Sequence, residues 1–177
     1  MKRKLLFGLA ISALCSTVVF SQKSPISLNP QFKVELGLHG VGIAYEFPLA
    51  EKVAIDLSTG YGGLNRNGGY ILSNDEKVSF FAKSEIKYFR GRQARLDKGK
   101  SLIHNSGNYL AFQTKFNNNT PRDGKVIMNE LHWGRQVDLG TNILFQMHLG
   151  LGHYKNLDTS DSGVYPGFGI KFSYVFF

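Results

Sequence analysis

The sequence predicts an all-β protein, in the form of a closed antiparallel up-and-down β-barrel of about eight strands. Three observations lead to this prediction. The chain has 177 residues, a length that suits one domain. Apolar and polar residues alternate with period two along most of it, which indicates strands whose two faces meet different surroundings. Clusters of Gly, Asn, Asp and Pro separate the alternating segments, as turn residues separate the strands of an all-β fold.

The first residues have the layout of a secretory signal peptide. Bases at 2–4 precede an apolar run that begins at Leu5, and small residues lead up to Ser21, as they do before a signal-peptidase cut. We therefore expect a leader at 1–21 and a single mature domain at 22–177. A buried N-terminal helix is the alternative interpretation of the same residues.

Composition limits the chemistry of the mature chain. The only cysteine, Cys15, lies in the leader, so we expect no disulfide, no thiol nucleophile and no Cys-based metal site. A lipoprotein signal with a lipidated Cys15 is an alternative, but it would need a small residue where Leu14 stands. The formal charge of +8 is partly due to the leader. Nucleic acid is not an expected partner of an exported protein.

Six segments show the alternation clearly. In each of them one face collects aliphatic and aromatic side chains, and the other collects small or polar ones. A helix would bring polar Gln146 and apolar Ile143 to the same side, so period two describes the pattern better. The predicted strands are 53–61, 78–89, 108–116, 126–137, 141–154 and 165–177.

Alternation alone does not say which face points outward. The apolar face points inward in a water-soluble sandwich and toward lipid in a membrane barrel. Export favours the membrane barrel, as do the small residues mixed with charges of both signs on the polar face. So do aromatic residues near strand ends, which suit interfacial girdles: Tyr45, Phe47, Tyr61, Tyr88, Trp133, Phe172 and Tyr174. We therefore predict a transmembrane β-barrel.

The strand count depends on the segment 32–47, where the apolar positions change from even to odd numbers across His39-Gly40. A two-residue hairpin there would place Leu38 opposite Val41 and give eight strands. A β-bulge in one long strand would give seven. We favour eight because membrane barrels tend to have an even number of strands.

The final segment, 169–177, reads GIKFSYVFF and ends in Phe177. With the leader and the alternating strands, it resembles the small outer-membrane β-barrel proteins of Gram-negative bacteria, the superfamily of the OmpA membrane domain and OmpX. The resemblance covers essentially the whole mature chain and is architectural, and Phe172 stands where the family's C-terminal signal usually has Gly. It implies a monomer in the cell outer membrane, in contact with lipids including lipopolysaccharide. It also implies recognition of the C-terminal strand by the barrel-assembly machinery.

A basic tract follows the predicted strand 78–89. If Phe177 is periplasmic, this tract lies on the periplasmic side together with the short links 49–52 and 138–141, and the long loops lie at the other end. Its bases could contact phosphates of lipid headgroups or of lipopolysaccharide. The alternative is a solvated turn that could include a short helix. The residues are Arg90, Arg92, Arg95, Lys98 and Lys100.

Ten polar side chains are expected to face the lumen. Unpaired buried charges cost several kcal/mol, so we expect these groups to pair and to fill the barrel. A proton or ion path is the alternative, but eight strands leave little room for one. The predicted network consists of Glu46, Asp56, Lys83, Glu85, Lys87, Lys115, Glu130, His132, His148 and Lys171.

No motif predicts catalysis. The outer-membrane lipid A deacylases have Ser two residues after their His, whereas Gly150 follows His148 and Lys155 follows His153 at that spacing. The histidines are scattered, so we predict no metal ligand, no cofactor and no catalytic residue. The predicted role is structural or surface interaction. The alternatives are a lipid A-modifying enzyme (deacylase or acyltransferase), which needs Ser, His and an acid together at the outer rim, and a soluble periplasmic barrel that binds lipid inside.

Overall fold

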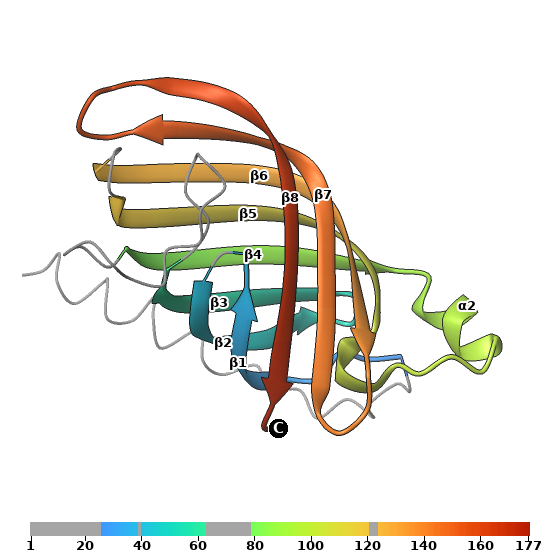
Figure 1. The fold of residues 1–177 in the computed structure, drawn as a ribbon. Helices are drawn as coiled ribbons and strands as arrows, with labels where there is room; N and C mark the ends of the chain where they lie inside the picture. Colours follow the sequence, from blue (N-terminus) through green and yellow to red (C-terminus); the bar gives the residue numbers. More distant parts are fainter. Residues whose placement is uncertain (1–25, 39, 63–78, 121–123) are drawn as a thin grey trace, which may run out of the picture.

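The computed structural model describes residues 26–38, 40–62, 79–120 and 124–177. They form eight antiparallel strands, each bonded to its neighbours in sequence, and β1 pairs with β8 to close the barrel (Figure 1). The predicted all-β, up-and-down architecture with eight strands is confirmed. The predicted leader and most of the predicted loop at 62–77 lie outside the described residues.

The eight strands differ in length, and the second half of the barrel has the longer ones. A short helix, α2 (Arg92–Asp97), and a 3-10 turn, η1 (Ile103–Asn105), connect β4 to β5. In the described part of the chain, no helix has the length and apolar character needed to cross a membrane. The strands are β1 (Gln31–Gly37), β2 (Gly40–Ala50), β3 (Val53–Tyr61), β4 (Phe80–Arg90), β5 (Gly107–Thr120), β6 (Gly124–Asp138), β7 (Ile143–Asn156) and β8 (Ser162–Val175).

The change of parity at the start of the barrel is a hairpin, as we favoured, but its turn lies one residue earlier than expected. Gly37 pairs with Gly40, and Leu36 rather than Leu38 lies opposite Val41. Gly40 has a φ of 117°, and a Cβ at this position would collide with the carbonyl oxygen of Tyr61 on β3. Glycine therefore permits both this backbone conformation and the close approach of the two strands.

The two faces of the strands have the predicted orientation. Large apolar side chains on the outer face are exposed, for example Trp133 at 47% and Phe168 at 58%. Most charged side chains on the inner face are buried, and Lys33, Glu46 and Lys87 have no exposed area. The sheet therefore encloses the charged side chains, whereas most of the large apolar side chains lie on its outside.

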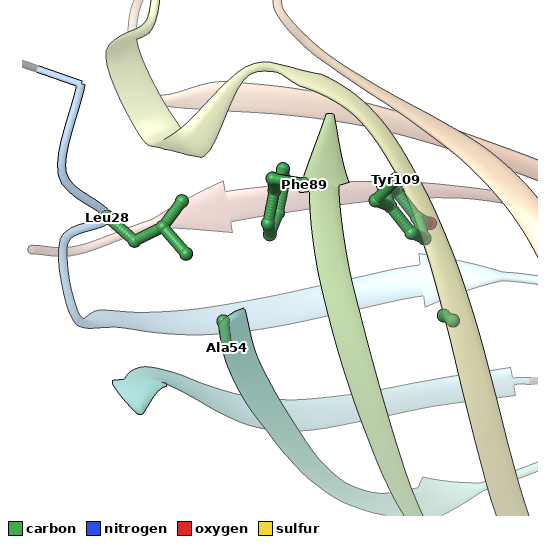
Figure 2. Packing of buried hydrophobic residues seen from close by; sticks show 5 residues of the cluster. Leu28, Ala54, Phe89 and Tyr109 are labelled. Carbon is green, nitrogen blue, oxygen red and sulfur yellow. The ribbon is translucent and has the colours of Figure 1, made fainter. Parts of the chain in front are cut away.

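One end of the barrel, here called the turn end, carries the short links and the C-terminal residues. The β6–β7 link lies beside the end of β8, because Val175 donates its backbone N–H to the carbonyl of Asn142. The segment 26–30 lies at this end as well, and Leu28 packs there with Ala54, Phe89 and Tyr109 (Figure 2). Ala111 completes this apolar cluster. The opposite end, which carries the β1–β2 and β7–β8 connections, is the loop end.

Candidate functional site

The polar side chains near the turn end form a compact group that we call the ion box: Lys33, Glu46, Asp56 and Lys87. The Nζ of Lys33 lies 3.2 Å from Glu46 Oε2 and 2.8 Å from Asp56 Oδ2. The Nζ of Lys87 lies 2.6 Å and 2.9 Å from the same two oxygens. All four side chains are fully buried, so each lysine bridges both carboxylates out of contact with water.

The strand register explains why the box needs two lysines. Glu46 of β2 lies directly opposite Asp56 of β3, which in turn lies opposite Glu85 of β4. Like charges at directly opposed positions repel each other. Lys33 reaches the pair from β1 and Lys87 from β4, so cations lie between carboxylates that would otherwise destabilise the sheet.

The box is covered on the turn side by side chains from the connection between β4 and β5. The amide of Asn105 donates to Glu46 Oε1 at 2.7 Å and to the carbonyl of Asn29 at 2.8 Å. The Asn29 N–H donates back to Asn105 Oδ1. Arg92 donates to the carbonyls of Ile26 and Ser27. The N-terminal segment is therefore fastened across this end of the lumen.

Farther from the turn end, three charges connect the box to the next group. Lys171 Nζ lies 2.8 Å from Glu35 Oε2, and Lys83 Nζ lies 3.6 Å from Glu35 Oε1 and 4.0 Å from Glu85 Oε2. Glu35, which lies on β1, forms ion pairs with both lysines and accepts a hydrogen bond from Lys171. Glu85 belongs to the next group. The charged network thus continues along the lumen.

That next group, here called the imidazole cluster, consists of Glu85, Glu130, His132 and His148. His132 lies between two carboxylates: its Nε2 is 3.1 Å from Glu85 Oε1, and its Nδ1 is 2.8 Å from Glu130 Oε1. His148 Nε2 lies 3.2 Å from the same Glu130 oxygen. The two imidazole rings stack with centroids 4.2 Å apart. Two strands, β6 and β7, therefore bring both rings to one carboxylate oxygen.

A cavity of about 460 Å³ adjoins the imidazole cluster on the loop side. Its lining includes Glu130 and His148, together with Tyr165 and Lys115. The His148 side chain is 23% exposed, whereas that of His132 is fully buried. The cluster is therefore accessible from the cavity on its His148 side.

Glycines of β7 and β8 make the room for these side chains. A Cβ at Gly167 would collide with the carboxylate of Glu130, and one at Gly169 would collide with the ring of His148. A Cβ at Gly150 would instead collide with the backbone carbonyl of Leu131 and with Cα and Cβ of His132, so this glycine allows β6 and β7 to approach closely. The small residues of the polar face therefore make room for large polar groups, here the carboxylate of Glu130 and the ring of His148.

All ten residues of the predicted lumen network lie inside the barrel. Lys115 and His148 are half-buried and the other eight are buried. The structure divides them among the ion box, the connecting charges and the imidazole cluster, and Lys115 lies over the ring of Phe81. The sequence analysis missed Lys33 and Glu35. The apolar positions Phe32, Val34 and Leu36 could have identified them, because residues between outward positions point inward.

The five residues of the predicted basic tract do not form one continuous exposed surface. Arg90, Lys98 and Lys100 are exposed. Arg92 is buried and binds backbone carbonyls, so its assignment as a headgroup contact is corrected. Burial lowers the pKa of the Arg92 guanidinium from its ordinary value, and nearby Glu46 opposes this shift. Arg95 is half-buried and donates to the carbonyl of Ser101.

The arrangement that would favour a lipid A-modifying enzyme is not formed by the candidate histidines. His148 faces the lumen and contacts Glu130, whereas His153 is exposed on the other face of β7. Asp161, in the neighbouring loop, accepts a hydrogen bond from Tyr154. No known protein family, no curated protein and no solved structure matches this chain.

Proposed function

We propose that this protein is an integral outer-membrane β-barrel with a structural or surface-interaction role, surrounded by lipid and filled by its own charges. One observation carries the proposal: the barrel turns its apolar face outward and its ionic face inward. A monomer among outer-membrane lipids, including lipopolysaccharide, is part of the same proposal. The surface interaction would be made by residues of the loop end.

The outward face is the wrong surface for a protein dissolved in water. Large apolar side chains are exposed on every strand, among them Leu36, Ile86, Leu131 and Phe168. Soluble monomers rarely expose contiguous apolar patches of more than a few hundred Å². In hydrocarbon the same side chains need no cover, and a closed barrel leaves no unpaired strand edge. A soluble lipid-binding barrel predicts the opposite arrangement, with aromatics inside and charges outside.

Aromatic side chains near the turn end support the same orientation. Tyr45 stacks on Phe47, and Tyr174 contacts Phe176 edge-on. Tyr45, Tyr88, Tyr174 and Phe176 are exposed. Aromatic rings with an apolar body and a polar tip are enriched where a membrane meets water. A lipid boundary at this level of the barrel would suit them.

The charged side chains in the half of the lumen nearest the turn end, here called the turn half, oppose the passage of ions. The ion box is fully buried, and the apolar cluster around Leu28 lies beside it at the same end. An ion that crossed the lumen would have to separate charged pairs that are 2.6–3.2 Å apart. We therefore expect a barrel that does not conduct, which suits a structural or interaction role.

Trp133 provides a direct test, because it is the only tryptophan and it lies on the outer face. The protein is reconstituted in vesicles whose phospholipids carry bromine on the acyl chains. We expect strong quenching of Trp133 fluorescence by these lipids and weak quenching by aqueous iodide. A heat-modifiable band in the outer-membrane fraction should accompany it.

The matched control moves the probe from the outer to the inner face. In the double variant Trp133→Phe with Phe89→Trp, the tryptophan replaces a fully buried inner side chain, and acyl-chain bromine should quench it far less. If Trp133 responds to iodide and not to brominated lipid, the membrane assignment is wrong.

A further inference from the structure

The geometry around Glu130 is not explained by a charge-filled barrel. Its Oε1 faces His132 Nδ1 at 2.8 Å and His148 Nε2 at 3.2 Å. Neither contact has the angles of a hydrogen bond, so Glu130 Oε1 and His132 Nδ1 are buried without a hydrogen-bond partner among the described residues. Buried polar atoms are nearly always satisfied. When Nε2–H of His132 donates to Glu85, Nδ1 and Glu130 Oε1 both present lone pairs to each other, and such an arrangement calls for a cation or a proton that both atoms can bind.

We propose that Glu130, His132 and His148 bind a divalent transition-metal cation of the Zn²⁺ type. One donor atom from each residue lies within 4.8 Å of the other two. Donor atoms bonded to one tetrahedral Zn²⁺ at about 2.0–2.2 Å lie about 3.3–3.5 Å apart. The two separations that involve Glu130 Oε1, 2.8 Å to His132 Nδ1 and 3.2 Å to His148 Nε2, are close to this spacing.

The donor set suits this class of ion. Imidazole nitrogens favour Zn²⁺, Cu²⁺ and Ni²⁺, whereas Mg²⁺ and Ca²⁺ favour sites made of oxygens. Two imidazoles and one carboxylate are a known combination for Zn²⁺ with three protein ligands. The fourth position would face the cavity, where water is available to fill it.

A second layer of contacts orients the ligands. Glu85 Oε1 lies 3.1 Å from His132 Nε2 and so directs the opposite nitrogen, Nδ1, toward Glu130. The hydroxyl of Tyr165 donates to Glu130 Oε2 at 3.3 Å, which leaves Oε1 to the metal. Metal-binding histidines usually donate their other ring N–H to a carboxylate, a backbone carbonyl or a water, and Glu85 is such a carboxylate.

The surroundings also provide space and access. The glycines at 167 and 169 leave room for the carboxylate of Glu130 and the ring of His148. The 460 Å³ cavity reaches two of the ligands, Glu130 and His148. The competing explanation is an ion pair in which a proton on each imidazole compensates the carboxylate, and the experiment must separate the two.

The experiment titrates Zn²⁺ and Co²⁺ into the untagged protein purified in detergent, so that its outcome does not depend on where the barrel resides. Calorimetry measures the Zn²⁺ affinity, and the visible absorption of Co²⁺ reports nitrogen and oxygen ligation. We expect one equivalent of Zn²⁺ and a Co²⁺ spectrum that Zn²⁺ abolishes.

Variants assign the binding to the cluster. His148→Ala and Glu130→Gln should each weaken Zn²⁺ binding by about 100-fold or more, and Glu85→Gln, which acts through His132, by about tenfold. His153→Ala is the matched control, because it changes an exposed histidine of the same strand, and it should bind Zn²⁺ as the unmodified protein does. The heat-modifiable band confirms that each variant is folded.

Two results would overturn the proposal. The first is an unmodified protein that binds no Zn²⁺ and gives no ligated Co²⁺ spectrum, which would leave the proton-compensated ion pair. The second is a folded His148→Ala or Glu130→Gln variant that binds Zn²⁺ as tightly as the His153→Ala control.

Discussion

The two halves of the lumen both contain buried carboxylates but pair them with different partners. In the turn half, lysines and carboxylates meet at 2.6–3.2 Å with no exposed area, and the apolar cluster around Leu28 lies beside them. In the loop half, imidazoles replace lysines as the partners of Glu130, one ring is partly exposed, and a cavity adjoins them. The turn half is filled by its side chains, whereas the loop half contains a cavity.

This difference shows that buried charges can have different roles in the two halves of one lumen. Lysine is a flexible point charge that can bridge two carboxylates, so a lysine box closes a narrow barrel well. Neutral imidazole is a rigid ring with a lone pair. It can either hydrogen-bond to a carboxylate or bind a metal ion. The glycines of β8 lack a side chain that would occupy the space beside the imidazole ring. We expect stability to depend mostly on the turn half and ligand binding on the loop half.

The largest expected effect is a loss of stability when the ion box is opened. In Lys87→Met the side chain keeps its length but leaves Glu46 and Asp56 with one lysine instead of two. Breaking a buried ion pair in this way costs about 3–5 kcal/mol. We expect a decrease of that size in the free energy of unfolding, measured in urea with the protein in detergent or lipid.

Lys115→Met is the matched control for the box, because Lys115 is half-buried and lies over the ring of Phe81. Its replacement should destabilise the barrel clearly less than Lys87→Met does. Equal effects of the two variants would mean that the box has no special role in stability, and that the contrast between the halves is wrong.

Much of the barrel could be predicted from the sequence because the pleat fixes the face of each residue. Once Ile55 and Leu57 are placed outside, Asp56 must point inward. The partner of Asp56 could not be predicted in this way. Lys33 and Lys87 reach it from β1 and β4, and such contacts depend on strand tilt and register, which alternation does not encode.

The parts that sequence reasoning missed have physical reasons of their own. Arg92 stands in a run of bases that resembles a solvated surface, but its carbonyl partners, Ile26 and Ser27, are more than 60 residues away. His132 and His148 stand far apart in the sequence and belong to no recognisable ligand motif. The short β6–β7 link sets the register that places Gly134 opposite His148, so counting across that hairpin could have brought the two rings together.

An intermediate effect is expected from filling the space in the loop half. In Gly167→Ala the new methyl group would meet the Glu130 carboxylate, which must then move. Overpacking a filled interior costs about 1–3 kcal/mol, and we expect a decrease of that size in the free energy of unfolding. Gly107→Ala is the control, because its methyl group would make only ordinary contact with Phe89, at 3.7 Å. A Gly167→Ala variant as stable as Gly107→Ala would show that the glycine is not needed for space.

The smallest expected effect tests the loop half from the opposite direction. In metal-free protein, kept in a chelator, His148→Gln removes a half-buried ring, but Glu130 keeps His132 at 2.8 Å and the Tyr165 hydroxyl at 3.3 Å. We therefore expect a decrease in the free energy of unfolding of about 1 kcal/mol or less, the net contribution of one polar contact, in contrast to Lys87→Met. Added Zn²⁺ should then stabilise the unmodified protein, because a ligand that binds only the folded state raises its stability, and should leave His148→Gln unchanged. A large loss of stability in the chelator would mean that His148 holds the barrel together as the lysines of the box do, and the two halves would then differ in residue type but not in role.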